Sequence, residues 1–473
     1  MDPRTPVIVG SGQFTVTDRS VPTSTKAILV EAAQRALADT GAGERLRAKT
    51  QSVGVVNTVT WWVGDHAAEI AAELGITPTE TVGSHIGGTA PLEHLRDACA
   101  RIAQGELSVA VITGGEAVKA MNDGRYVADA PVEGPAPTRV LGTDRVAVHE
   151  LELATGLGLP TQIYPLFEHA LRAADGQSRA DLDAEIGALW ARLAEVAKSN
   201  PHAWDTSAPD ADTILSSRMI ADPYRKLLTA NIQVDQGAAL VVCSAEAAEA
   251  AGVPKERWVF PHAVALGNDH WFVSSRDELH RSPAIAGIGS ALRDHTGLGT
   301  GEIAHLDLYS CFPSAVRIAA RELGVDLTDR VPSVTGGLTF SGGPANNYVT
   351  HSVATMVDRL REDPAATGLC TAVGWFLTKH GGAVLSGRPP AREFGALSVD
   401  VSGLPSREIV SGGSGTVETF TVEHDRYGQR TGFVLYRTES GARGVGQVSD
   451  VDSLDCDPIG HQVTTVDGTL QFS

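Results

Sequence analysis

The chain has 473 residues, 42% of them apolar and 50 of them glycine, and it carries a formal net charge of −19. This length exceeds one ordinary domain, so we expect two or three domains with well-buried cores. The negative charge argues against nucleic acid or an anionic membrane surface as a partner, because binding phosphate requires clustered Lys and Arg.

The N-terminus and the cysteines indicate the cellular setting. Residues 1–6 lead directly into a predicted strand without the basic and apolar regions of a signal peptide, and no apolar run is long enough to span a bilayer. The five cysteines are scattered, odd in number and without a CxxC pair, so neither a disulfide framework nor a zinc site is expected. We therefore predict a cytoplasmic protein without a metal centre.

Short β-rich runs alternate with helical patterns along most of the chain, which predicts a layered α/β fold. These runs are nearly all apolar rather than alternating, as expected for strands covered on both faces. The predicted strands are residues 7–10, 53–57, 109–113, 238–242, 306–309 and 369–373.

An internal duplication is visible in the order of these elements. A Gly87-Gly88 turn, a helical stretch and the strand at 109–113 are similar to a later unit with Gly342-Gly343, a helix and the strand at 369–373. We therefore predict two facing halves, residues 1–265 and 266–390. Residues 118–232 are expected to form an inserted helical subdomain of the first half, because apolar residues recur there at helical spacing.

The pattern changes after Pro389-Pro390, since consecutive prolines end regular structure. Residues 415–422 and 432–437 alternate apolar and polar side chains with period two. We expect residues 391–473 to form a small all-β domain, OB-like in architecture. This region has few aromatic residues for stacking on bases, so a docking or lid module is favoured over nucleic-acid binding.

Two glycine turns could present backbone groups to a ligand. The first places Gly87 and Gly88 at the start of a helix, where free N–H groups favour a partial negative charge. The second is Phe340-Ser341-Gly342-Gly343-Pro344. A turn that only packs a helix on a strand is the alternative interpretation for either one.

Together with Asp307-Leu308-Tyr309-Ser310-Cys311-Phe312-Pro313, these turns resemble the motifs of the thiolase superfamily over about residues 5–386. The resemblance implies a duplicated thiolase fold, with α/β/α/β/α layers, and a coenzyme A thioester ligand. The segment from Asp307 to Pro313 is similar in particular to the corresponding motif of the sterol-carrier-protein branch of this superfamily. However, Gly88 stands where this family has its nucleophilic cysteine, and Gly343 replaces the histidine of the Gly-His-Pro motif. The acyl-enzyme route therefore lacks its nucleophile and its activating base.

Two tyrosines resemble those of the thiolase-fold aldolases of steroid side-chain degradation. Tyr309 begins one such motif, and Tyr348 lies in a segment like their second tyrosine segment, although the preceding glutamate is missing. We expect the two tyrosines to face one pocket, with buried core rings as the alternative. His380 is the best general base by residue type, and a surface histidine in a glycine loop is its alternative.

The remaining candidates would contact the substrate. They are Gly87, Gly88, Gly343, Asn347 and Cys311. Cys311 could also serve as a displaced nucleophile, although a buried inert thiol is commoner.

The leading hypothesis is a cysteine-independent, aldolase-like reaction on a β-hydroxyacyl-CoA in lipid metabolism, with Tyr309, Tyr348 and His380 as acid–base groups. The thioester is a substrate, and no bound cofactor is expected. The alternatives are an acyl-CoA acyltransferase that uses Cys311 and a non-catalytic acyl-CoA-binding or assembly protein. A homodimer is compatible with each of them.

Overall fold

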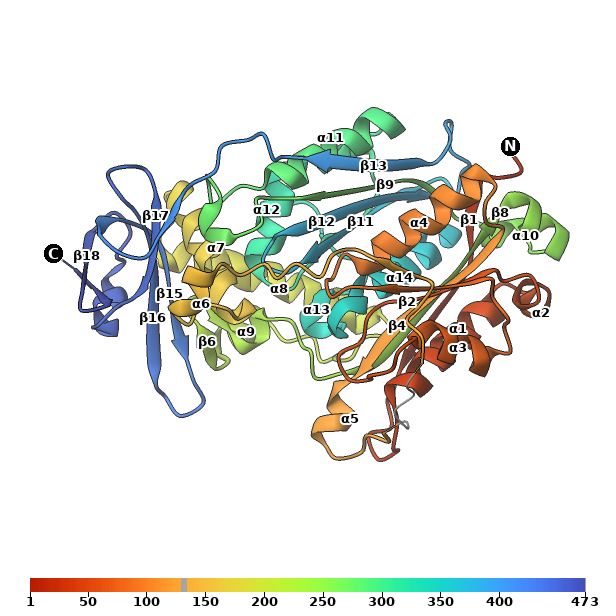
Figure 1. Cartoon of the computed structure of the whole chain (residues 1–473), viewed down its shortest axis with the longest axis horizontal. Helices are drawn as coiled ribbons and strands as arrows, with labels where there is room; N and C mark the ends of the chain where they lie inside the picture. The colour runs from red at the N-terminus through yellow and green to blue at the C-terminus, as the bar shows by residue number, and fades with distance from the viewer. Residues whose placement is uncertain (129–133, 473) are drawn as a thin grey trace.

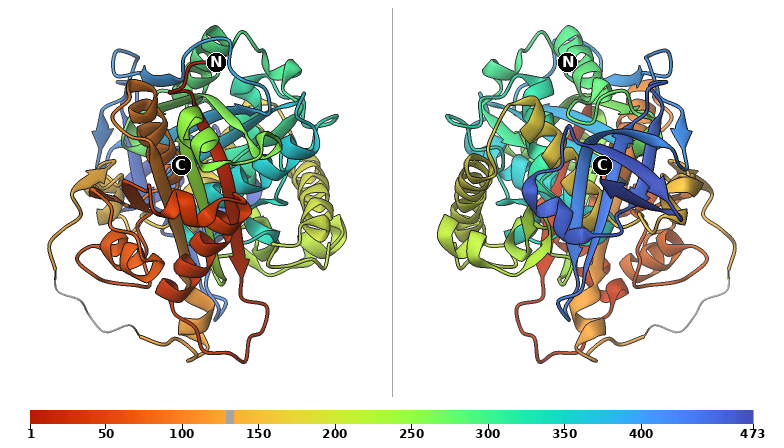
Figure 2. Two further views of the ribbon diagram at one scale, coloured as in Figure 1. Left: turned by 90° about the vertical axis from the view of Figure 1, so that its right-hand side faces the viewer. Right: turned by 90° about the vertical axis from the view of Figure 1, so that its left-hand side faces the viewer.

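The computed structural model describes residues 1–128 and 134–472. Two mixed sheets lie face to face with helices between them and on their outer sides (Figure 1). A third sheet covers one end of this body, as the right view of Figure 2 shows. The predicted fold class, a duplicated layered α/β fold with a C-terminal β region, is confirmed.

Sheet 1 belongs to the first half of the chain. Its strand order is β1 (Pro6–Thr15), β8 (Asp235–Ser244), β4 (Val109–Ala117), β2 (Ser52–Val55), β3 (Glu80–Ser84) and β5 (Arg139–Leu141). β4 and β8 are buried along their whole length, which explains their continuous apolar runs.

Sheet 2 belongs to the second half. Its strand order is β10 (His305–Asp307), β11 (Thr367–Gly374), β12 (Lys379–Ser386), β9 (Phe260–Asn268) and β13 (Gly395–Asp400). Every residue of β12 is buried, so the Thr378-Lys379-His380 segment leads into a core strand rather than forming an exposed loop.

Helices complete the five layers. α4 (Ala90–Gln104) and α14 (Tyr348–Glu362) lie between the sheets and contact both of them. α1 (Thr25–Asp39) and α3 (His66–Leu74) cover the outer face of sheet 1, while α11 (Pro283–Thr296) covers that of sheet 2. The other helices are α2 (Gly43–Arg47), α5 (Val118–Asn122), α6 (Glu150–Ala154), α7 (Pro160–Ala174), α8 (Arg179–Ser199), α9 (Ala211–Ser216), α10 (Ala245–Ala251), α12 (Pro313–Leu323) and α13 (Gly337–Phe340).

The C-terminal sheet is joined to the body. Its order is β14 (Ile409–Val410), β17 (Arg443–Gln447), β16 (Arg430–Arg437), β15 (Ser414–His424), β18 (Gln462–Val466) and β19 (Thr469–Phe472), and β15 also pairs with β6 (Met219–Ala221), which pairs with β7 (Tyr224–Arg225). Arg443 is buried and donates hydrogen bonds to the carbonyls of Ser274 and Asp277. Phe433, Leu435 and Val445 belong to the main apolar core cluster, so one face of the sheet shares a core with the body.

Strand pairing crosses three of the predicted boundaries. Position 265 falls inside β9, and β13 pairs with β9 although it follows residue 390, so sheet 2 spans residues 260–400. Within the region predicted as a helical insertion, β5 and β6 each pair with a strand outside it. Strand pairing between distant segments, which has no local sequence signal, accounts for all three differences.

No helix among the described residues is long and apolar enough to cross a membrane.

Candidate active site

The site begins at the turn before α4. Gly87 has φ +151°, and its N–H donates to Oδ1 of Asn346 at 2.9 Å. We expected this N–H to be free for a ligand, but Asn346 occupies it. Thr89 precedes the helix, but its hydroxyl donates to Glu93 instead of capping the helix. Over the described residues, the N–H groups of Gly88 and Thr89 have no acceptor. The turn thus keeps two free donors at the positive end of a helix dipole.

Gly88 leaves room for the Tyr309 hydroxyl. A Cβ at position 88 would lie 2.7 Å from this oxygen and 2.3 Å from the carbonyl oxygen of Val373. Both distances are shorter than van der Waals contact, so no larger residue fits here unless its neighbours move. The tyrosine hydroxyl therefore occupies space beside position 88 that a cysteine side chain would require.

Tyr309 is buried, and its ring meets that of Tyr348 edge to face with centroids 5.6 Å apart. Within the part of the chain that the structure describes, its hydroxyl has no hydrogen-bond partner. Burial raises the pKa of Tyr309 well above its usual value, so the phenol is protonated at neutral pH. Tyr309 and His380 line one cavity of about 10 Å³, which is room for one water molecule at most.

Tyr348 has a different environment although its ring touches that of Tyr309. Its hydroxyl donates to Oδ1 of Asp307 at 2.9 Å and shares a hydrogen bond with Thr335 at 2.6 Å. Burial and the Asp307 carboxylate raise the pKa of Tyr348 well above its usual value. Because the hydroxyl is fixed as a donor to a buried carboxylate, the geometry does not favour the acid–base role that we expected for Tyr348.

His380 is a buried histidine on β12, not a surface one. Its Nε2 lies 3.0 Å from Oδ2 of Asp269 and 2.9 Å from the carbonyl oxygen of Leu377. Both neighbours are acceptors, so Nε2 carries the proton and the lone pair is on Nδ1. Nδ1 is buried without a partner. The ring is therefore held in the tautomer that a general base requires.

Asp269 fixes this tautomer, and the sequence analysis did not find it. Besides His380, it accepts hydrogen bonds from the Ser282 hydroxyl and the Ala284 N–H at the start of α11. Burial opposes its ionisation, but the hydrogen bonds from His380 and Ser282 lower the pKa of Asp269 below its usual value. No local motif marks Asp269, which is far from His380 in the sequence.

Three other predicted residues do not line the cavity between Tyr309 and His380. Gly343 is buried, and a Cβ there would meet nothing closer than 3.4 Å, so packing does not require glycine. Asn347 is buried and accepts a hydrogen bond from Thr350, while its Nδ2 has no partner. Burial raises the pKa of Cys311 to about 12, which disfavours a nucleophilic thiolate. None of the three lines the small cavity.

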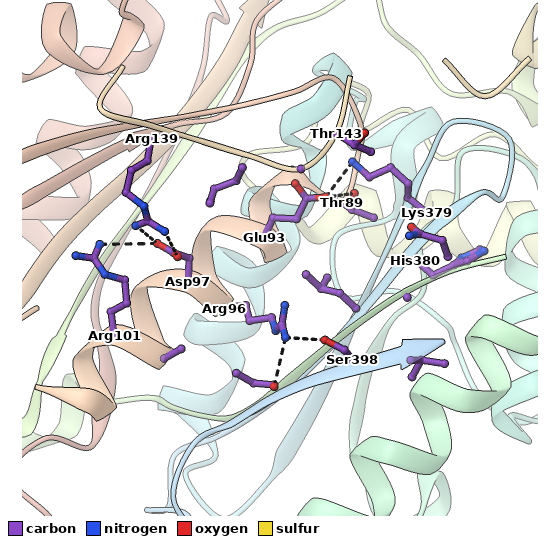
Figure 3. Close-up of a pocket in the computed structure, with 18 of the residues that line it drawn as sticks. Thr89, Glu93, Arg96, Asp97, Arg101, Arg139, Thr143, Lys379, His380 and Ser398 are labelled. Carbon is purple, nitrogen blue, oxygen red and sulfur yellow. Dashed lines mark hydrogen bonds and ion pairs between the residues drawn. The ribbon is translucent and has the colours of Figure 1, made fainter. Parts of the chain in front are cut away.

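An open groove of about 920 Å³ runs along α4 to this cluster (Figure 3). Its floor is one face of α4, and its walls come from β5, β9 and β13. Arg139 makes two hydrogen bonds to Asp97 within it. At the inner end, Lys379 reaches toward Glu93 and Thr89, next to His380.

Solved structures share this architecture. A monomeric SCP2-thiolase-like protein type 1 from Mycobacterium smegmatis has 30% sequence identity and a TM-score of 0.85, covering 100% of this chain and 99% of its own. The Ltp2-ChsH2(DUF35) aldolase has 22% identity and a TM-score of 0.64, covering 82% and 98%. The dimeric peroxisomal thiolase of Saccharomyces cerevisiae has 15% identity and a TM-score of 0.57, also covering 82% and 98%. No protein-family model and no curated protein sequence matches the chain.

These likenesses define the fold as that of the thiolase superfamily. Within the superfamily, the identity and the coverage of both chains show that this chain belongs to the SCP2-thiolase-like proteins.

Proposed function

We propose that the protein binds a coenzyme A thioester and catalyses cysteine-independent cleavage or formation of a C–C bond on a β-hydroxyacyl thioester. The observation that carries this proposal is the Tyr309 hydroxyl, which lies against Gly88 and has no hydrogen-bond partner among the described residues. A protonated phenol there can serve an acid–base reaction, whereas an acyl-enzyme would need a nucleophile at this point. The similarity to an aldolase of the same fold supports this class of reaction.

The reaction needs one base and one acid, and two residues suit these roles. Nδ1 of His380 takes the proton of the β-hydroxyl, and the resulting imidazolium is stabilised by Asp269. The Cα–Cβ bond breaks as the β-carbon becomes a carbonyl, and its electron pair forms the thioester enolate. Tyr309 then gives its proton to the α-carbon. The products are an aldehyde or ketone and a shortened acyl-CoA.

The cycle closes without an outside reactant. In this scheme the proton on His380 returns to the Tyr309 oxygen, and both residues line the same water-sized cavity. The free N–H groups of Gly88 and Thr89 can hold the enolate oxygen at the helix terminus. In this scheme Tyr348 is a positioning residue, which supports the ring of Tyr309 through their edge-to-face contact.

The test combines turnover with intact mass. The pure protein is incubated with a panel of β-hydroxyacyl-CoAs, and the carbonyl and acyl-CoA products are measured by mass spectrometry. Tyr309→Phe should lower turnover at least about 100-fold, since a general acid or base typically contributes about 100- to 10,000-fold. Tyr427→Phe, at a tyrosine 83% exposed, is the matched control and should have no effect. Full activity of Tyr309→Phe would contradict the proposal.

Intact mass separates this proposal from acyl transfer. We expect no stable acyl adduct after exposure to acyl-CoA. A stoichiometric adduct that is lost in Cys311→Ala would support the acyltransferase alternative instead.

A second candidate function is acyl-CoA binding without catalysis. One observation favours it: the cavity between Tyr309 and His380 holds about 10 Å³, too little for an acyl chain unless side chains move. Binding of acyl-CoA without product from any member of the panel would support this candidate.

A further inference from the structure

The side chain of Lys379 is buried beside the turn that precedes α4. It is 5% exposed, and its Nζ lies 3.1 Å from the position that a Cβ on Gly87 would occupy. The same ammonium lies 3.5 Å from the corresponding position on Gly142, which follows β5. Lys379 thus brings a positive charge to the inner end of the groove, where Figure 3 shows it next to Thr89 and Glu93.

The Lys379 ammonium has one carboxylate beside it and no second acceptor among the described residues. Its ion-pair partner among the described residues is Glu93, with Nζ and Oε1 2.9 Å apart, but the pair does not have hydrogen-bond geometry. Oε1 of Glu93 accepts instead from the Thr89 hydroxyl, and Oε2 is buried without a donor. The ammonium has three N–H groups and a single carboxylate oxygen at this distance, so an oxygen from a ligand can serve as a further acceptor.

Three unused donors lie around this point. They are the Lys379 ammonium and the N–H groups of Gly88 and Thr89. α4 has 15 residues, so its positive end adds a helix dipole to the charge of the ammonium. The Tyr309 hydroxyl lies 2.7 Å from the position of a Cβ on Gly88, which puts a proton donor next to the same site.

We propose that Lys379, with the N–H groups of Gly88 and Thr89, forms an oxyanion site that holds the thioester oxygen of the ligand as it becomes an enolate. The ligand class rests on the proposed function. Lys379 supplies a full positive charge where charge develops in the reaction, and Glu93 holds the ammonium over Gly87 before the ligand arrives. Glu93 opposes the enolate, so its neutralisation should strengthen the site.

The test uses acetoacetyl-CoA, which forms an enolate by losing one proton from its α-carbon to the buffer and does not need to be cleaved. The enolate absorbs in the near ultraviolet, so its fraction is read directly as a function of pH, and total binding is measured by calorimetry. The native protein should stabilise the bound enolate relative to free acetoacetyl-CoA. Lys379→Met should reduce this stabilisation about 100-fold or more, as expected for loss of an oxyanion donor.

Matched variants keep the result interpretable. Lys198→Met, at a lysine 60% exposed that also pairs with a glutamate, should leave the enolate unchanged. Glu93→Gln should increase the enolate fraction at a given pH. Lys379→Met leaves Glu93 buried without its counter-charge, so the double variant Glu93→Gln/Lys379→Met tests the same loss with no uncompensated carboxylate. Circular dichroism confirms that each variant is folded.

The outcomes separate this inference from the proposed function. An equal enolate fraction in Glu93→Gln and in a folded Glu93→Gln/Lys379→Met double variant would overturn the oxyanion site, even if β-hydroxyacyl-CoA is cleaved normally. Enolate stabilisation that depends on Lys379, without cleavage of any β-hydroxyacyl-CoA, would support the site and contradict the proposed reaction. Failure of acetoacetyl-CoA to bind would overturn both.

Discussion

The space beside Gly88 gives the most direct structural prediction. Replacing Gly88 with alanine adds one methyl group whose carbon would lie 2.3 Å from the Val373 carbonyl oxygen, 2.7 Å from the Tyr309 hydroxyl and 3.1 Å from Cζ of the same ring. Gly88 does not have a positive φ angle, so alanine can adopt its backbone conformation and the cost of the substitution is steric. Overpacking of this kind costs about 1–3 kcal/mol, and we expect the upper part of this range because one neighbour is backbone.

A double-mutant cycle assigns the clash to its sources. Tyr309→Phe removes the 2.7 Å contact but leaves the ring carbon and the Val373 carbonyl in place. Gly88→Ala should therefore cost less in the Tyr309→Phe background, by about 0.5–1.5 kcal/mol, as is usual for residues in contact. The free energy of unfolding is measured by denaturant titration followed by circular dichroism, and variants are compared at equal m-value.

The control is Gly301→Ala, because a Cβ there has no atom within 4 Å. It should change stability by no more than about 0.5 kcal/mol. If Gly88→Ala were as stable as the native protein within the same margin, the Tyr309 hydroxyl would not fill this space. The assignment of Tyr309 to the position beside Gly88 would then be wrong.

Three further predictions concern other parts of the molecule. Tyr348→Phe should lower the free energy of unfolding by about 1–3 kcal/mol, because Asp307 loses a hydrogen-bond donor. It should reduce turnover far less than Tyr309→Phe does. An equal loss of turnover would show that Tyr348 is an acid–base group. Burial opposes ionisation of Asp222, but its contacts with His169 and Arg179 lower its pKa to about 2, so the stability it contributes is present above about pH 4 and lost as the pH falls through about 2. Between pH 5 and pH 2 the free energy of unfolding, measured by denaturant titration, should therefore fall by about 2 kcal/mol through Asp222 alone, and Asp222→Asn should lack this loss. An equal loss in both proteins would refute this. A chain ending at Ser402 keeps β13 in sheet 2, whereas a chain ending at Pro390 lacks it. The longer fragment should therefore have the higher melting temperature. Equal melting temperatures would mean that β13 contributes little to stability.

The sequence predicted the layers and the two glycine turns because both have local signals. Buried strands appear as continuous apolar runs, and a glycine pair before a helical pattern can be recognised in a single sequence. The strand β13 was missed because its residues alternate in exposure and follow the prolines, so nothing local distinguishes an edge strand of sheet 2 from a strand of the C-terminal sheet.

The chemistry of the site was less predictable from sequence. Tyr309 and Tyr348 looked equivalent, and only their surroundings separate them, since one hydroxyl donates to a buried carboxylate and the other has no partner in the described chain. Asp269 and Glu93 became candidates through their contacts with His380 and Lys379. Such pairings depend on how β9, α4 and β12 are placed, which residue type and spacing do not specify.

The strand order of sheet 1 also has a consequence for how the chain folds. β8 lies between β1 and β4, so residues 6–15 form their ladder with residues 236–244 and not with an adjacent segment. Such distant pairings slow folding, because a long loop must close before the contacts form. During synthesis, β1 and one edge of β4 have no partner strand until β8 has left the ribosome. These apolar edges are therefore where we expect chaperone binding or misassembly in the nascent protein.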